Sequence, residues 1–104
     1  MNKKEFTETL NYVVVQVNNA WVWLEHSDDL EMTRKTTLNL LKFMSNLVDE
    51  MSKKKPIKTD YKQQIALVET THKIELMRGI FEKTKDFLVE YKKEMLQMVK
   101  NEKV

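Results

Sequence analysis

The sequence has 104 residues, of which 18 are lysine or arginine and 16 are aspartate or glutamate, so its formal net charge is only +2. This length allows one domain, and the absence of cysteine excludes disulfides and thiolate chemistry. A single glycine and a single proline leave little turn-forming material, so the composition predicts few loops and long helices.

The first predicted element is a helix from about residue 3 to residue 25. Asn2 is followed three positions later by Glu5, which is the spacing of a capping box. Apolar residues recur every three or four positions along one side: Phe6, Leu10, Val13, Val17, Trp21 and Leu24. The β-branched and aromatic residues of 12–23 also permit a β-hairpin, but its turn, Asn18-Asn19, lacks the glycine that tight hairpins prefer.

This first helix is apolar on more than one side. A helix that is apolar around most of its circumference is normally buried on most sides. Aromatic side chains also concentrate binding energy at protein interfaces. We therefore expect four residues off the main stripe to bind a partner protein: Tyr12, Val15, Val22 and Trp23.

The second helix is predicted from about residue 29 to residue 51. After a break at His26 and Ser27, Asp28 and Glu31 have capping-box spacing. The apolar stripe of this helix consists of Leu30, Thr37, Leu41, Met44, Val48 and Met51. Methionine is an adaptable filler, so we expect the methionines to lie in the core.

Residues 52–58 form a basic linker, because Pro56 removes a hydrogen-bond donor and disfavours helix at the residue before it. Residues 53–104 carry thirteen basic and eight acidic side chains, against five and eight in residues 1–52. The linker lysines, together with the C-terminal lysines, either contact nucleic acid or simply form a solvated surface. Because 16 of the 18 basic residues are lysine, any such binding should be weak and independent of base sequence. The linker lysines are Lys53, Lys54, Lys55 and Lys58.

The last element is predicted as one long helix from about residue 60 to residue 101, with Asp60 near its start. Its main apolar stripe consists of Tyr61, Ile65, Val68, His72, Leu76, Ile80, Thr84, Phe87, Tyr91, Met95 and Met98. A second, shorter line consists of Leu67, Ile74, Met77, Phe81 and Leu88. A helix of about 40 residues is roughly 60 Å long, which is more than the preceding helices can cover.

This uncovered length predicts a homodimeric helical bundle or coiled coil. The residues expected in the dimer interface are Ile80, Phe87, Tyr91, Met95 and Met98. Gly79 leaves an alternative open: a turn there would produce a four-helix up-down bundle. Without such a turn, Gly79 marks a kink or a place where another helix approaches closely.

The residues that could carry chemistry are few. Glu69 and His72, with Glu75 one turn further on, have the spacing used in helical di-metal sites, but such a site needs two of these pairs and additional glutamates. We therefore expect His72 to lie in a helical core. No nucleophile is placed beside a histidine in a recognisable pattern, and no glycine-rich loop could hold a phosphate. We expect neither an enzyme nor a cofactor.

The sequence thus predicts one all-α domain, built from a helical hairpin and a long C-terminal helix. The expected function is that of a small homodimeric adaptor or inhibitor that binds a larger protein, and the size and style of the chain are those of short helical phage or mobile-element proteins. The apolar window of residues 12–24 is too short to cross a bilayer and no signal peptide precedes it, so we expect a cytoplasmic protein without membrane contact. No motif connects the chain with a known family.

Overall fold

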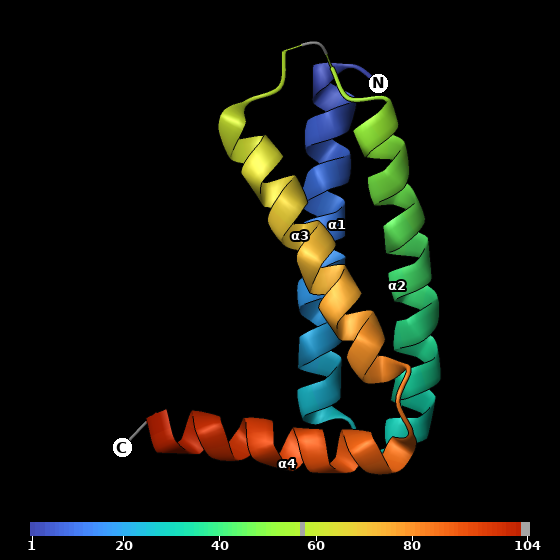
Figure 1. Cartoon of the computed structure of the whole chain (residues 1–104), viewed down its shortest axis with the longest axis vertical. Helices are drawn as coiled ribbons and strands as arrows, with labels where there is room; N and C mark the ends of the chain where they lie inside the picture. Colours follow the sequence, from blue (N-terminus) through green and yellow to red (C-terminus); the bar gives the residue numbers. More distant parts are fainter. Residues whose placement is uncertain (57, 103–104) are drawn as a thin grey trace.

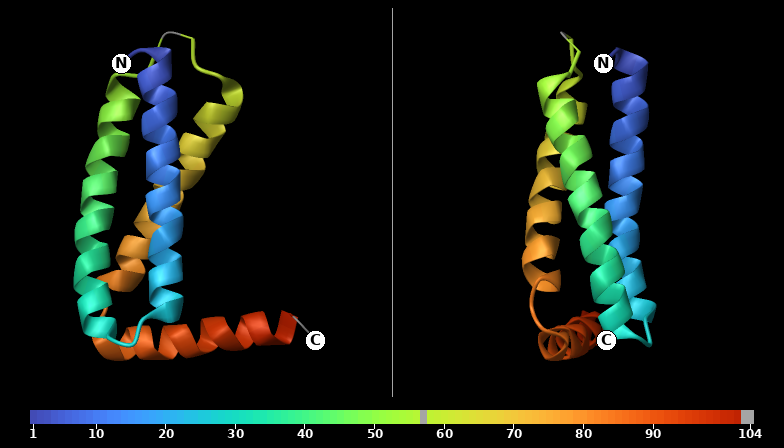
Figure 2. Two further views of the ribbon diagram at one scale, coloured as in Figure 1. Left: turned by 180° about the vertical axis from the view of Figure 1, so that it is seen from behind. Right: turned by 90° about the vertical axis from the view of Figure 1, so that its right-hand side faces the viewer.

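The structure is a computed structural model that describes residues 1–56 and 58–102. Over these residues the chain forms four helices: α1 (Lys3–His26), α2 (Leu30–Lys53), α3 (Tyr61–Phe81) and α4 (Lys85–Glu102). Helices α1 to α3 form a bundle, and α4 lies crosswise at its lower end and extends past α1 (Figures 1 and 2). The prediction of an all-helical chain is confirmed, and the β-hairpin alternative is wrong because residues 12–23 are helical.

Side-chain caps define the beginnings of the first three helices. The Asn2 Oδ1 accepts a hydrogen bond from the Glu5 N–H at 2.8 Å, and the Asn2 amide donates to the Glu5 carboxylate at 2.9 Å. Asp29, and not the predicted Asp28, caps α2 by accepting a first-turn N–H at 3.1 Å. Asp60 caps α3 in the same way at 3.0 Å. Ile57, in the predicted linker, lies outside the described residues.

The predicted single helix over residues 60–101 is wrong, because the chain leaves the helical path between Phe81 and Lys85. The last turn of α3 closes with the Glu82 N–H donating to the Arg78 carbonyl at 2.8 Å. Thr84 then caps α4, since its Oγ1 accepts from a backbone N–H three residues on at 3.3 Å. Glu82, Lys83 and Thr84 thus form a non-helical link between α3 and α4, and this link contains neither glycine nor proline.

Gly79 is neither a turn nor a close contact within this chain. It lies inside α3, and a Cβ added to it would meet nothing within 4 Å. Glycine in a helix interior costs about 1 kcal/mol relative to alanine. The fold of the single chain therefore provides no reason for this glycine.

One side of each helix forms the core. The buried apolar residues are Phe6, Leu10, Val13, Val17, Ala20, Leu24, Leu41, Met44, Val48, Met51, Leu67, Ile74, Met77, Phe81 and Leu88. The stripes predicted for the first two helices are confirmed almost residue by residue. Met44, Met51 and Met77 lie in the core as predicted, whereas Met32 is 66% exposed and Met98 64% exposed. Only Leu88 represents α4 in this set, so α4 is attached to the bundle by a small buried contact.

In α3, however, the shorter of the two predicted lines is the buried one. The main stripe lies on the opposite side of the helix and stays at the surface, where Tyr61 is 74% exposed, Val68 55% and Leu76 61%. His72 belongs to this stripe and is exposed, so the core of the single chain does not contain it. A three-helix bundle covers only one side of each helix, and α3 has two apolar sides. We call the exposed set the outer α3 stripe: Tyr61, Ile65, Val68, His72, Leu76 and Gly79.

Candidate interaction surfaces

The outer face of α1 is apolar and exposed. The four residues predicted to bind a partner lie off the buried face of α1, with Val15 and Val22 opposite it, and each is between 41% and 52% exposed: Tyr12, Val15, Val22 and Trp23. In a chain in which 33% of the residues are charged, α1 carries no charge from Thr9 to Leu24. Depletion of charged residues around exposed aromatic groups is typical of the centre of a protein–protein interface.

The surface beside this face extends onto α2. Phe43 is 53% exposed, and it lines an open groove with Tyr12 and Leu47, bordered by Glu8 and Thr9. Phe43 is not among the residues that the sequence pattern predicted for a partner surface. Its position one residue before the buried Met44 turns it toward solvent, as the helical angle of about 100° per residue requires.

Helix α4 is held against the bundle by an aromatic stack and a few polar contacts. The Tyr91 ring stacks on Trp21 of α1, with centroids 6.1 Å apart, and Phe87 stacks on Tyr91 at 6.3 Å. The Lys92 ammonium donates to the Ser27 carbonyl at 2.7 Å. Burial at this contact raises the pKa of the Tyr91 hydroxyl above its ordinary value, because desolvation disfavours the charged form.

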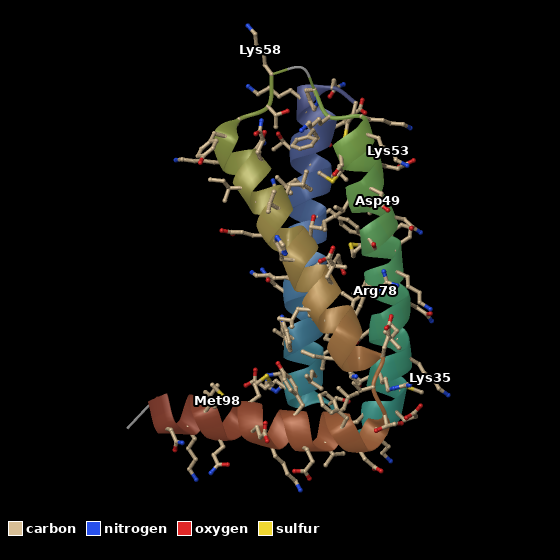
Figure 3. The ribbon with its side chains drawn as sticks, viewed as in Figure 1. Lys35, Asp49, Lys53, Lys58, Arg78 and Met98 are labelled. Carbon is tan, nitrogen blue, oxygen red and sulfur yellow. The ribbon has the colours of Figure 1, made fainter. Side chains whose placement is uncertain are left out.

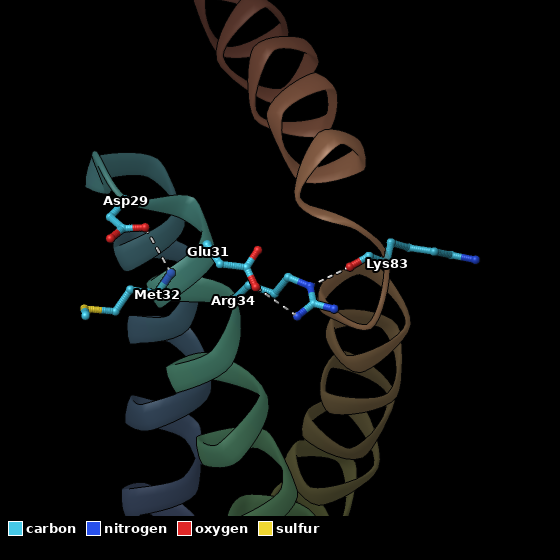
Figure 4. A network of polar contacts seen from close by, with 5 residues as sticks. All are labelled: Asp29, Glu31, Met32, Arg34 and Lys83. Carbon is cyan, nitrogen blue, oxygen red and sulfur yellow. Dashed lines mark hydrogen bonds and ion pairs between the residues drawn. The ribbon is translucent and has the colours of Figure 1, made fainter.

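A second set of polar contacts holds the link between α3 and α4 (Figure 4). The Arg34 Nε donates to the Lys83 carbonyl at 2.6 Å, which ties α2 to the link. The Arg34 guanidinium also lies 3.7 Å from the Glu31 carboxylate. This anchor comes from 49 residues away in the sequence, so no local pattern could have predicted it.

The five residues predicted for a dimer interface fall into two groups, because α4 packs against the bundle of its own chain. Ile80, Tyr91 and Met95 are half-buried against the core of their own chain. Phe87 remains 42% exposed and Met98 64% exposed. Met98 lies on the part of α4 that extends beyond the bundle (Figure 3). Much of the predicted dimer surface is therefore occupied within the single chain, and the dimer itself stays a prediction.

The outer α3 stripe borders two open hollows. One, of about 280 Å³, lies along the first turns of α3 and is lined by Tyr61, Ile65 and Val68 with Gln64 and Glu69. The other, also of about 280 Å³, lies where α3 leans away from the ends of α1 and α2. His72 and Lys55 line this second hollow together with apolar residues and short polar ones. Neither hollow brings together groups arranged for catalysis.

The four predicted nucleic-acid contacts, Lys53, Lys54, Lys55 and Lys58, are all exposed and lie at the upper end of the bundle. Figure 3 shows Lys58 pointing away from the protein there. The Lys54 ammonium lies 3.8 Å from the Glu50 carboxylate, and both are exposed, so the pair is weak. The four lysines are therefore accessible to a polyanion, but only Lys55 lines a hollow.

Metal-binding side chains do not gather anywhere in residues 1–56 and 58–102: these residues contain no group of three that could hold an ion. Glu69, His72 and Glu75 all point to the surface from α3. None of the helices described here is both long and apolar enough to cross a lipid bilayer.

Comparisons of this chain with protein families, with curated proteins and with solved structures found no match. Its function must therefore be argued from the surfaces of the molecule itself.

Proposed function

We propose that this chain is a non-enzymatic interaction module, a small homodimeric adaptor or inhibitor that binds a larger protein through the outer face of α1. The observation that carries this proposal is the uncharged outer face of α1, with Tyr12, Val15, Val22 and Trp23 exposed on it. Exposed apolar and aromatic side chains gathered on one uncharged helix face are typical of an interaction site. Glu8 and Glu25 border the face at either end, as a polar rim borders an interface.

The groove beside Tyr12 adds a place for a partner side chain. Binding energy at interfaces concentrates in aromatic groups that enter such pockets. Tyr12, Phe43 and Leu47 provide the apolar part of the lining of this groove. A partner segment with one protruding apolar side chain would fit here.

The test is affinity capture from the cells that make the protein, using wild type and Val15→Glu. A buried, unpaired carboxylate is strongly unfavourable at an interface, so we expect Val15→Glu to lose a partner that wild type retains. Asn46→Glu, at an exposed position of α2, is the matched control and should retain the partner. Circular dichroism verifies that all three proteins are equally helical. Recovery of the same proteins by wild type and Val15→Glu would contradict the proposal.

The alternative function is non-specific binding of nucleic acid through the exposed lysines at the upper end of the bundle. It predicts retention on heparin at low salt, because phosphate contacts weaken steeply as salt displaces them. Replacing Lys53, Lys54 and Lys55 by glutamate should then abolish binding. Under the adaptor proposal the same replacement leaves partner capture unchanged.

A further inference from the structure

The outer α3 stripe has a symmetric pattern that the single chain does not use. Counted from His72, Val68 and Leu76 lie four residues to either side, and Ile65 and Gly79 lie seven residues to either side. All five residues are on the side of α3 opposite its buried line. In the right-hand view of Figure 2, α3 forms one side of the bundle, and none of the other described helices lies outside it.

A pattern that reads the same in both directions matches an antiparallel copy of itself. In a two-fold symmetric interface, the same surface of both molecules meets, so residue i contacts j and j contacts i. An antiparallel pair centred on His72 places Ile65 of one copy opposite Gly79 of the other. It likewise places Val68 opposite Leu76, and His72 opposite His72.

Gly79 gains a reason in this arrangement. Apart from its own turns of α3, no described residue lies within 4 Å of a Cβ added there, and its φ is not positive, so neither crowding nor backbone conformation requires a glycine. A helix interior disfavours glycine more than any residue except proline. Opposite the branched side chain of Ile65, the missing side chain provides the space that a second helix needs.

The charges beside the stripe also match. Glu69 and Lys73 are exposed along the same flank of the stripe, and neither makes an ion pair with the rest of the described chain. In the antiparallel pair, Glu69 of each copy lies close to Lys73 of the other. Two attractive pairs form by symmetry, which orients the two copies.

We propose that two copies of this protein pair through their outer α3 stripes, antiparallel and centred on His72. This inference rests on the self-association in the proposed function and changes its location from α4 to α3. The outer face of α1 stays free for another protein.

The first test changes the size of the side chains at the two positions that face each other, Ile65 and Gly79. Gly79→Leu brings a leucine against Ile65 of the other copy, and Ile65→Ala leaves a gap, so each variant alone should self-associate at least tenfold more weakly than wild type by analytical ultracentrifugation. Mixed together, the two variants restore both contacts. The introduced leucine then faces the introduced alanine, while the native Ile65 and Gly79 face each other at the second contact. The mixture should therefore form a heterodimer in native mass spectrometry. In a parallel pair each position would meet its own equivalent, so mixing the two variants would restore neither native contact.

The second test compares three surfaces with one type of change. Val68→Glu should abolish self-association, whereas Val15→Glu on α1, at similar exposure (52% against 55%), should leave it unchanged. Met98→Glu on α4 should also leave it unchanged.

Three outcomes overturn the inference. A dimer disrupted by Met98→Glu and not by Val68→Glu would overturn it while the proposed function stands. A dimer that Gly79→Leu does not weaken would also overturn the inference and leave the proposed function standing. A wild type that stays monomeric at high micromolar concentration would overturn both this inference and the homodimer, but partner binding through α1 would still be decided by Val15→Glu.

Discussion

The hydroxyl of Thr37 is fully buried in α2 and has no hydrogen-bond partner among the described residues. A buried polar group without a partner destabilises a fold by about 1–3 kcal/mol. Valine has nearly the same shape and lacks the hydroxyl. We therefore expect Thr37→Val to raise the free energy of unfolding by about 1 kcal/mol, measured by urea denaturation.

Thr71→Val is the control for this prediction. The Thr71 hydroxyl donates to the Leu67 carbonyl at 2.7 Å, so its removal should leave the free energy of unfolding unchanged or slightly lower. An equal gain from both substitutions would show that valine stabilises these helices for a reason other than the unpaired hydroxyl.

Tyr91 makes the stability of the protein depend on pH in the alkaline range. Burial raises the pKa of Tyr91 above its ordinary value of 10.0, so the unfolded chain ionises at a lower pH than the folded one. The stabilising contribution is complete below about pH 10 and is lost as the pH rises through the folded pKa.

Tyr91→Phe isolates this effect, because it removes the hydroxyl and changes no other titratable group. We expect the difference in free energy of unfolding between wild type and Tyr91→Phe to be constant below about pH 10 and to shift against wild type above it. A difference that stays constant well into the alkaline range would show that Tyr91 is as solvated in the folded protein as in the unfolded chain.

Among the elements, α4 is the least secured. Leu88 is its one fully buried residue among those described, and a buried leucine replaced by alanine typically costs about 2–5 kcal/mol. We expect Leu88→Ala to detach α4 while α1, α2 and α3 remain folded. Hydrogen exchange should then accelerate throughout α4 and change little in the other helices.

Leu96→Ala is the matched control, since Leu96 is 39% exposed on the same helix. It should leave exchange in α4 nearly unchanged. If Leu88→Ala accelerated exchange equally in all four helices, α4 would belong to the same cooperative unit as the bundle.

The ends of three helices could be predicted from the sequence, because they depend on local chemistry. Asn2, Asp60 and Pro56 act through their immediate neighbours, and the structure places the helix boundaries within about two residues of the prediction. The break between α3 and α4 could not be predicted from the sequence. Thr84 is a weak signal for a cap, and the contact from Arg34 that holds the link is visible only in three dimensions.

For the molecule as a whole, two copies paired through α3 should make thermal stability depend on protein concentration. Gly79→Leu removes a helix-interior glycine and should stabilise the isolated chain by up to about 1 kcal/mol. We therefore expect Gly79→Leu to have the higher Tm in dilute solution. Wild type, which gains from self-association, should reach or exceed it at high concentration.

Differential scanning calorimetry across a roughly hundredfold range of concentration checks this expectation. A wild-type Tm that does not change over that range would contradict it. So would a Gly79→Leu Tm that rises with concentration as steeply as that of wild type.

The candidate surfaces were only partly predictable at this scale. Tyr12, Val15, Val22 and Trp23 were identified because their helix has one clear inner stripe, which leaves the rest outside. On α3 the two apolar lines are similar in strength, and periodicity alone cannot say which one the bundle covers. Only the packing of Leu67, Ile74 and Met77 against the other helices decides that.

The uncharged stretch from Thr9 to Leu24 also matters while the chain is being made. The buried side of this stretch is fully enclosed only after α3 has been synthesised, and the last core residue of α3 is Phe81. At about 5–20 residues per second, the ribosome takes several seconds to add that much polypeptide. During that interval the tryptophan and valine side chains of α1 are exposed to solvent. We therefore expect the nascent chain to bind the chaperones that act at the ribosomal exit.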